Sequence, residues 1–413
     1  MGGDDHADQV TVAPLHEPRD GIPDVIADDA ALARACDQLA EGTGAVAVDT
    51  ERASGYRYWP RAYLIQVRRE GAGTHLIDPI ALDESNGGLT PLIDILNDVP
   101  WVLHAASQDL PCLAELDLYP PALFDTELAA RLAGYQRVAL GTMVEQLLGY
   151  RLEKGHSAAD WSTRPLPAAW LNYAALDVEL LLPLRDRLAE ELVRQDKLDW
   201  AEQEFEAVRT APAPEPKAEP WRRTSGIHKI RTPRALATVR ALWQARDQLA
   251  RKRDRAPGRV LPDSAIVAAA SADPRTVEQL RALPVFGGKM QRRLSSMWLR
   301  HIQTARALPK AELPSAAQNN GGPPPPNRWS DRDPDAAARL SAARAALTEL
   351  AEKLHLPVEN LLLPDLVRRL CWEPPDDVSP EAIATELTAR GARAWQVEQT
   401  AGLLSTALSA TSG

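Results

Sequence analysis

The sequence predicts an α/β domain followed by two smaller all-helical domains. Its 413 residues are long for a single hydrophobic core, which indicates two or three domains. Apolar runs typical of strands occur in the first third of the chain, and helical patterns follow them as far as about residue 208. Two proline-rich stretches, 210–220 and 315–334, then set off two further helical blocks.

Composition along the chain sets the expected domain boundaries. Residues 1–22 are polar, acidic and without periodicity, so we expect a disordered tail there. The other expected segments are an α/β domain at 23–208, a linker at 209–230, a helical domain at 231–312, a second linker at 313–334 and a last helical domain at 335–410.

The first domain is expected to begin with an amphipathic helix. Asp28 can cap the N-terminus of this helix, and Gly42 can end it. Its apolar positions share one face: Leu32, Cys36 and Leu39. Runs rich in Val, Ile, Leu, Tyr and Trp then predict strands at 45–49, 62–68, 74–78 and 101–105. Helical patterns dominate from 110 to about 208.

The two helical blocks that follow look like repeats of one unit. "LARKRDRAPGRVLPD" begins at Leu249 and "LAEKLHLPVENLLLPD" begins at Leu350, and each contains Leu-Ala-x-Lys, a loop and Leu-Pro-Asp. Short matches of this kind also arise by chance in helices rich in Leu and Ala. The match alone therefore leaves the repeat open.

Charge is distributed unevenly along the chain. From Trp221 to Arg300 there are 18 Lys and Arg against 5 Asp and Glu, a net charge of +13. The whole chain carries −10, which leaves −23 for the remainder. The basic segment is therefore suited to contact an anionic polymer.

Cysteine usage and hydropathy indicate the compartment. The three cysteines, Cys36, Cys112 and Cys371, lack the spacing of a zinc site or a disulfide framework, which indicates a reducing environment. No segment approaches about 18 consecutive apolar residues, and the acidic N-terminus has no signal-peptide pattern. We expect a cytoplasmic protein without membrane contact.

Carboxylates occur where three predicted elements end or begin. The run "VAVDTER" closes an apolar strand with Asp49 and Glu51, which share a face because strand side chains alternate. Asp109 opens the helix after another strand, and Tyr173 and Asp177 lie four residues apart on one face of a late helix. Two close carboxylates raise each other's pKa unless a cation lies between them. The pattern therefore indicates a cation site.

Each of these residues also has a structural alternative. A strand-end Asp is often a turn or cap residue, and Asp109 could cap its helix. Tyr173 could be a core tyrosine, and His104, at the end of the preceding strand, could be a core histidine with satisfied hydrogen bonds. The set in order favours a functional site: Asp-x-Glu on a strand, Asp at a strand-to-helix junction, and Tyr-x-x-x-Asp on a helix.

In this order and in their surroundings, these residues resemble the DEDD superfamily of 3′-to-5′ exonucleases in its tyrosine-bearing branch, and more closely the bacterial ribonuclease D family. The first motif matches at Asp49-Thr50-Glu51, with "YWP" and "LIQ" after it. The second matches at "HAASQD", with Gln108 where an acid is common. "HLIDP", "FDTELAARLAG" and "DWSTRPLP" match the segments around and between the motifs. The resemblance covers about residues 25–205.

The helical blocks extend this resemblance. "ALWQARDQLARKRDRAPGRVLPD" resembles the start of a helicase-and-ribonuclease-D C-terminal (HRDC) domain, and 335–410 resembles a degenerate second copy. The resemblance implies an RNase H-like mixed sheet flanked by helices, with the acids at one end, followed by two all-α HRDC-type domains.

The resemblance also implies a chemistry. It implies a 3′-5′ exoribonuclease that releases 5′-monophosphates from free RNA 3′ ends, with tRNA precursors among its substrates and no nucleotide cofactor. Four carboxylates suit two divalent cations, Mg²⁺ or Mn²⁺, in an in-line hydrolysis. Asp49 would bridge both ions, Glu51 and Asp177 would hold the nucleophile's ion, and Asp109 would hold the second. Tyr173 would orient the attacking water.

Substrate contacts are expected where the family holds the terminal nucleotides. These positions are Thr50, Tyr58, Trp59, Gln66 and His104. An aromatic side chain at Tyr58 or Trp59 would offer a platform for a splayed base. Packing is an equal alternative for Trp59.

The basic segment is expected to bind nucleic acid. The candidate residues are Arg251, Lys252, Arg253, Arg255, Lys289, Arg292 and Arg293. A charge run is usually a solvated face, but a net charge of +13 exceeds what solubility requires.

Two rival functions remain open from the sequence. One is a 3′-5′ exonuclease acting on DNA in repair, single-stranded DNA included, because only contacts to the 2′-hydroxyl distinguish the polymers. The other is a non-catalytic RNA-binding scaffold, which the presence of every motif acid disfavours.

Overall fold

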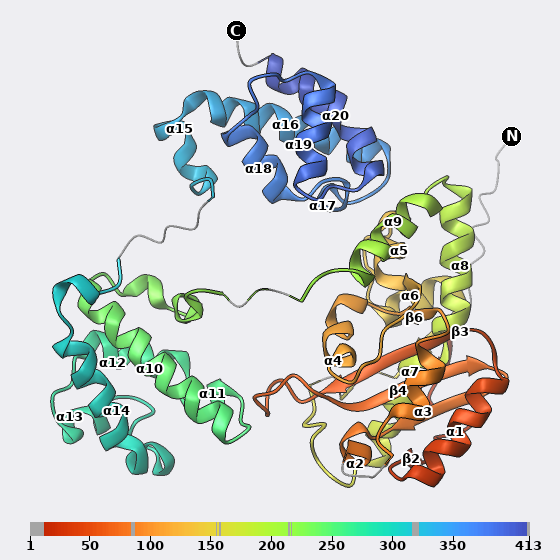
Figure 1. The fold of residues 1–413 in the computed structure, drawn as a ribbon, viewed down its shortest axis with the longest axis horizontal. Coiled ribbons are helices and arrows are strands. Elements are labelled where there is room, and N and C mark those ends of the chain that lie inside the picture. The colour runs from red at the N-terminus through yellow and green to blue at the C-terminus, as the bar shows by residue number, and fades with distance from the viewer. Residues whose placement is uncertain are drawn as a thin grey trace, which may run out of the picture.

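The chain forms an α/β domain (13–209), a middle helical domain (220–312) and a C-terminal helical domain (326–409) (Figure 1). The computed structural model describes residues 12–83, 87–153, 155–156, 158–213, 215, 217–315 and 322–410. Within these ranges, no helix combines the length and the apolar character needed to cross a membrane.

One mixed sheet organises the α/β domain. Its six strands lie in the order β2-β5-β4-β3-β6-β7, with β4 antiparallel to both of its neighbours and the other pairs parallel. Two further strands of the domain, β1 and β8, form a separate two-stranded sheet. In chain order the strands are β1 (Ala13–Leu15), β2 (Val25–Ile26), β3 (Thr43–Arg52), β4 (Ala62–Glu70), β5 (Gly73–Ile77), β6 (Trp101–Leu103), β7 (Leu123–Asp125) and β8 (Tyr150–Leu152). The predicted strands correspond to β3, β4, β5 and β6 and are confirmed.

Helices cover both faces of this sheet. The helices of the domain are α1 (Asp29–Glu41), α2 (Pro79–Asp83), α3 (Thr90–Leu96), α4 (Leu110–Ala114), α5 (Thr126–Leu132), α6 (Leu140–Leu148), α7 (Ala168–Glu179), α8 (Leu181–Arg194) and α9 (Leu198–Arg209). Val46 and Val48 of β3 pack with α1, α3 and α4, whereas Ala47 between them faces α8. Helix α1 begins at Asp28, whose side chain accepts from the Ala31 N–H, and ends at Gly42 as expected.

The N-terminal segment is more ordered than expected. The prediction of a disordered tail at 1–22 is wrong from residue 12 onward, and residues 1–11 lie outside the described residues. Strand β1 pairs in parallel with β8. The segment after it crosses α7, where Asn172 Nδ2 donates to the His16 carbonyl at 2.7 Å. Three-residue strands such as β1, β7 and β8 give no periodic signal, which explains why the sequence did not predict them.

The middle and C-terminal domains repeat the same helix order. The middle domain contains α10 (Pro233–Lys252), α11 (Pro257–Val260), α12 (Asp263–Ala272), α13 (Val277–Arg281) and α14 (Lys289–Ala307). The C-terminal domain contains α15 (Trp329–Arg332), α16 (Pro334–Lys353), α17 (Val358–Leu361), α18 (Pro364–Trp372), α19 (Pro380–Ala389) and α20 (Ala394–Ser409). Helices α16 and α17 begin and end 101 residues after α10 and α11, and α18 begins 101 residues after α12. This repeat supports the sequence match.

Both linkers are shorter than the sequence predicted. Trp221 lies in the expected linker 209–230 but is buried in the core of the middle domain. Trp329 lies in the expected linker 313–334 but is buried against Trp372, with ring centroids 4.9 Å apart. Short turns that follow a proline carry each tryptophan into its domain, so proline content alone placed the boundaries too late.

The C-terminal domain shares a hydrophobic core with the α/β domain. One cluster of buried residues runs from α5, α6, α8 and α9 into α16, α18 and α20. At its centre Trp395 stacks on Trp200, with centroids 4.8 Å apart and planes 13° apart, and Trp395 Nε1 donates to the buried Glu204 at 3.0 Å. Arg393 lies 3.0 Å from the same carboxylate, so the charge is paired.

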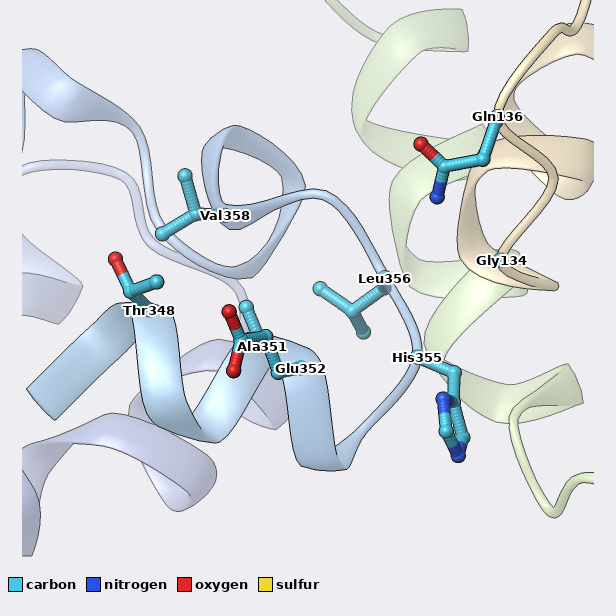
Figure 2. A pocket seen from close by; sticks show the side chains of 8 residues that line it. All are labelled: Gly134, Gln136, Thr348, Ala351, Glu352, His355, Leu356 and Val358. Carbon is cyan, nitrogen blue, oxygen red and sulfur yellow. The ribbon is translucent and has the colours of Figure 1, made fainter.

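The rim of this interface combines a close backbone contact with a hollow that adjoins it. Gly134 has φ +91°, and a Cβ there would lie 2.5 Å from the His355 carbonyl oxygen, so the approach requires glycine. Lys197 donates to the Leu132 carbonyl at 2.8 Å and to the His355 carbonyl at 3.4 Å. Figure 2 shows the adjacent hollow of about 380 Å³, with Gln136 on one side and Leu356 on the other.

We expect Trp395→Ala to destabilise both domains. Trp395 is 1% exposed, and truncating a buried tryptophan costs about 3–5 kcal/mol. Chemical denaturation should show this loss, and hydrogen exchange should show reduced protection in α9 as well as in α20. Trp59, which is 38% exposed, offers the matched control, and Trp59→Ala should change stability by less than about 1 kcal/mol. Unchanged protection of α9 would contradict a shared core.

Candidate active site

Strand β3 delivers two carboxylates to one face of the sheet. Side chains alternate along a strand, so Asp49 and Glu51 lie on the same face as Ala47, beneath α7 and α8. Thr50 and Arg52 lie on the opposite face, toward α4. The sequence predicted this placement of the two acids, and the structure has it.

Helix α7 brings the third carboxylate to the same place. Asp177 offers a carboxylate oxygen that lies within 4.8 Å of oxygens from Asp49 and Glu51. Tyr173, one turn earlier on α7, donates a hydrogen bond from its hydroxyl to Asp177. The buried Ala174 and Ala175 seat this helix against the sheet, and their small size lets it approach closely.

Asp109 reaches the site from the other face of β3. It lies where the turn after β6 enters α4, and Asp125 holds this turn by accepting from the Ala105 and Ala106 N–H groups at 3.0 and 2.8 Å. Thr50 Oγ1 donates to Asp109 Oδ1 at 2.8 Å, and the Arg52 guanidinium lies 3.5 Å from the same oxygen. The side chain of Asp109 caps no helix N–H, so the capping alternative fails.

Burial disfavours ionisation of all four acids, and repulsion from the neighbouring acids adds to it for Asp49 and Glu51. Burial, followed by the charges of Asp109 and Asp177, raises the pKa of Asp49 well above its usual range. Burial and the neighbouring Asp49 raise the pKa of Glu51 to about 10. Burial also raises the pKa of Asp177 to about 7 and that of Asp109 to about 6.

Tyr173 stays neutral in this environment. Burial and the negative charges of Asp177 and Glu51 raise the pKa of its phenol above the ordinary value. The ring packs beside Trp161, with centroids 6.5 Å apart, and beside His156, with centroids 6.1 Å apart. Its hydroxyl hydrogen is used by Asp177, so the oxygen lone pairs are left to accept from a water molecule.

The donor set fits divalent cations. Three carboxylates converge without a cationic partner of their own among the described residues, and hard oxygen ligands of this kind suit Mg²⁺ or Mn²⁺. Gln66, the cross-strand neighbour of Asp49, is fully buried, and neither polar atom of its side chain has a partner among the described residues. Buried polar groups are rarely left unpaired, so this amide also calls for a ligand or water at the site.

Two of the predicted substrate residues serve the fold in other ways. Thr50 donates to Asp109, as described above. His104 Nδ1 lies 2.9 Å from Thr126 Oγ1, the ring also bonds the Val138 carbonyl, and burial lowers its pKa to about 4. The ring thus has partners within the domain and is neutral, which favours the core-histidine alternative.

The aromatic pair on the β3–β4 hairpin lies at a domain contact. Tyr58 donates its hydroxyl to Asp247 at 3.0 Å, and Asp254 accepts from the backbone N–H groups of Tyr58 and Trp59 at 3.1 and 3.3 Å. The Arg251 guanidinium lies 5.6 Å from the centroid of each ring. The middle domain thus binds the hairpin through both of these predicted substrate residues, and Trp59 keeps an exposed side.

The predicted nucleic-acid-binding residues form an exposed basic surface on the middle domain. All seven are exposed: Arg251, Lys252, Arg253, Arg255, Lys289, Arg292 and Arg293. Arg253, Lys289 and Arg293 line a hollow of about 390 Å³ with Met290 and Leu294. Only Arg251 is used in the contact with the hairpin described above.

Sequence reasoning missed several residues around the acids. Arg52 directly follows Asp49-Thr50-Glu51 in the sequence, and a positive charge so close to two carboxylates could have been predicted to interact with the acids of the site. The Trp161 ring packs beside the Tyr173 ring. The Arg164 guanidinium donates to the Asp78 carboxylate at 2.6 and 2.9 Å, so the segments "DWSTRPLP" and "HLIDP" are joined to each other and have a structural role. Beside the acids, a hollow of about 210 Å³ is lined by Thr50, Glu51, Arg52, Ser54, Gly55, Tyr56, Ala158 and Ala159.

Comparison with known proteins assigns the chain to a family. A family model described as "3'-5' exonuclease" matches residues 23–193, and one described as "HRDC domain" matches 235–302. A third, "3' to 5' exonuclease C-terminal domain", matches 322–408. The ribonuclease D of Sphingobium indicum is 35% identical over 287 residues, covering 67% of this chain and 69% of the relative. The chain belongs to the ribonuclease D family. The ribonuclease D of Acidiphilium cryptum is also 35% identical, over 308 residues, with coverage of 71% and 75%.

Solved structures agree with this family assignment. A protein from Bifidobacterium adolescentis has a TM-score of 0.88 and 39% identity, covering 96% of this chain and all of that one. Escherichia coli RNase D, described as an exoribonuclease involved in structured RNA processing, has a TM-score of 0.68 and 26% identity, with coverage of 94% and 98%. The predicted fold class is confirmed, and the chain is a 3′-5′ exoribonuclease that acts on nucleic acid and uses divalent metal.

We predict that proton release limits metal binding in a defined pH window. All the ligating acids must lose their protons to bind a cation, and their raised pKa values run from about 6 for Asp109 and about 7 for Asp177 to about 10 for Glu51, so Mn²⁺ affinity should rise as pH increases from about 6 to about 10. Isothermal titration calorimetry in two buffers of different ionisation enthalpy would count the protons released. Affinity that does not change across this window would contradict the assignment.

The same raised pKa values should lower stability at high pH in a chelator. The folded protein holds protons that the unfolded chain has released, so the free energy of unfolding falls as pH rises above about 4; the contribution of Asp177 is complete near pH 7 and that of Glu51 near pH 10. Asp177→Asn should then raise stability above pH 7 by on the order of 2 kcal/mol. Asp37→Asn, at an exposed site on α1, is the matched control and should have little effect.

Proposed function

We propose that this enzyme shortens RNA from free 3′ ends by two-metal in-line hydrolysis and releases nucleoside 5′-monophosphates, with tRNA precursors and other stable RNAs as substrates. The observation that carries the proposal is the convergence of Asp49, Glu51 and Asp177 within 4.8 Å, next to a neutral Tyr173. Asp109, on the other side of β3, completes the acid set.

The carboxylates would hold two divalent cations, Mg²⁺ or Mn²⁺. Asp49 would bridge both ions, Glu51 and Asp177 would bind the one next to Tyr173, and Asp109 would bind the other. When bound, the ions would activate the attacking water and neutralise charge on the departing 3′ oxygen.

The protein side chains position the reacting groups. Tyr173 donates its only hydroxyl hydrogen to Asp177, so its oxygen can accept a hydrogen bond from the attacking water and fix its direction. Trp161 and His156 restrict the phenol ring. The hollow beside Glu51 would receive the terminal nucleotide, with the Gln66 amide and Trp59 as further candidate contacts.

The middle domain would retain the rest of the RNA strand. Its seven exposed cations would bind successive phosphates, a contact that depends on salt and not on sequence. The acidic α/β domain repels RNA except at the metal-loaded site. With the basic surface on the middle domain and the acids on the α/β domain, only the 3′ end of the RNA strand would reach the acids. The three cysteines are free and buried, which supports a reducing, cytoplasmic location.

The decisive experiment compares polymers and metals. The purified chain is incubated with 5′-labelled single-stranded RNA and DNA of equal sequence, with Mg²⁺, with Mn²⁺ and with a chelator. We expect stepwise shortening of RNA from the 3′ end, release of 5′-monophosphates and no reaction in the chelator. Faster shortening of DNA would favour the repair alternative, and metal-independent shortening would overturn the two-metal mechanism.

We predict that Tyr173→Phe separates catalysis from binding. The substitution removes one oxygen but leaves the ring packing and all four carboxylates, so kcat should fall by about 10²–10⁴. RNA affinity and Mn²⁺ binding should stay close to wild type. Tyr63→Phe, at a buried tyrosine on β4, is the matched control and should retain kcat. A normal kcat in Tyr173→Phe would remove this residue from the site.

A further inference from the structure

The feature that the mechanism leaves unexplained is the arginine bound to a proposed metal ligand. Arg52 donates one NH group to the Gln108 carbonyl, and its other NH group lies 3.5 Å from Asp109 Oδ1. Thr50 donates to that same oxygen, whereas Oδ2 has no partner among the described residues. Asp109 is thus held by a cation of the protein itself.

This arrangement places three of the four acids together and separates the fourth from them. Asp49, Glu51 and Asp177 converge, whereas Asp109 is turned toward the opposite face of β3 by Thr50 and Arg52. The charge of Arg52 also favours the ionised forms of Asp49 and Glu51, so it acts on the whole cluster. A positive charge in this place opposes a second divalent ion on Asp109.

Arg52 also has access to the substrate. Its side chain is 29% exposed and lines the hollow of about 210 Å³ next to Glu51, Ser54 and Tyr56. A guanidinium binds phosphate oxygens through two parallel hydrogen bonds, a stronger partnership than its single 3.5 Å contact with Asp109. A phosphate of an RNA strand in this hollow therefore competes with Asp109 for Arg52.

We propose that Arg52 is a positioning residue that makes binding of the second cation depend on RNA. In the free enzyme Arg52 holds Asp109 and opposes the second ion. In the complex a backbone phosphate takes Arg52, and Asp109 becomes available to the ion. This inference rests on the proposed two-ion function and adds the residue that controls when the second ion binds.

The test counts Mn²⁺ ions bound to the full chain at pH 8 without RNA, by calorimetry and by electron paramagnetic resonance. Charges of +1 and +2 about 6 Å apart, even in the dielectric of water, interact enough to change affinity about tenfold. Arg52→Gln should therefore bind the second Mn²⁺ at least about tenfold more tightly than wild type. Arg52→Lys keeps the charge and should stay close to wild type. Arg61→Gln, at an exposed arginine of the same hairpin, should change nothing.

A second measurement tests the contact with RNA. In a chelator, Arg52→Gln should reduce the slope of log affinity against log salt for single-stranded RNA by about 0.7, the loss of one phosphate contact. Unchanged or weaker second-ion affinity in Arg52→Gln, with melting temperature and first-ion affinity preserved, would overturn the inference alone. No Mn²⁺ binding by wild type would overturn the metal-dependent function and this inference with it.

Discussion

Concentrated, buried negative charge is the constraint on which the rest of this structure depends. Three carboxylate oxygens within 4.8 Å of one another, on an apolar sheet, repel each other and are poorly solvated. Only a folded core with surplus stability can hold them in place, and β3 is accordingly one of the two middle strands of the sheet, buried under helices on both faces. The cluster destabilises the protein that carries it, and that same property makes it a strong ligand for small divalent cations.

Because side chains alternate along β3, the residues of the short motif Asp49-Thr50-Glu51 serve both faces of the strand. Asp49 and Glu51 face α7, which supplies Asp177 and Tyr173, whereas Thr50 faces α4 and binds Asp109. Two ions that clamp one phosphate need ligands on both sides, and a single extended strand offers them with the fixed spacing of the backbone. One strand and two helices therefore suffice to assemble the acids, and the remaining elements hold these three in register.

The sequence was sufficient for features that depend on local periodicity. The period of two in β3 and of 3.6 in α7 placed four of the five proposed catalytic residues on the correct faces, and Asp28 and Gly42 marked α1 at both ends. Contacts between distant segments have no such signal. Strand β1 pairs with β8 across more than a hundred residues, Trp329 is buried inside an apparent linker, and Tyr58 bonds Asp247 at a separation of 189 residues. The family resemblance and the aromatic ring suggested a base platform at Tyr58, and nothing in the sequence indicated that the middle domain would contact this residue.

The two helical domains are joined to the exonuclease domain in physically different ways. The C-terminal domain shares an apolar core with α5 and α9, a contact whose stability is nearly independent of salt. The middle domain binds the β3–β4 hairpin mainly through charged and polar groups, among them Arg259, which donates to the Gly55 carbonyl at 2.7 Å and stacks on Tyr56. Gly55 and Tyr56 line the hollow next to Glu51, so a displacement of the middle domain alters a wall of the site within four or five residues of a catalytic acid. RNA held by the basic surface can therefore influence the site mechanically through this hairpin, whereas the C-terminal domain acts on it only through the stability of the shared core.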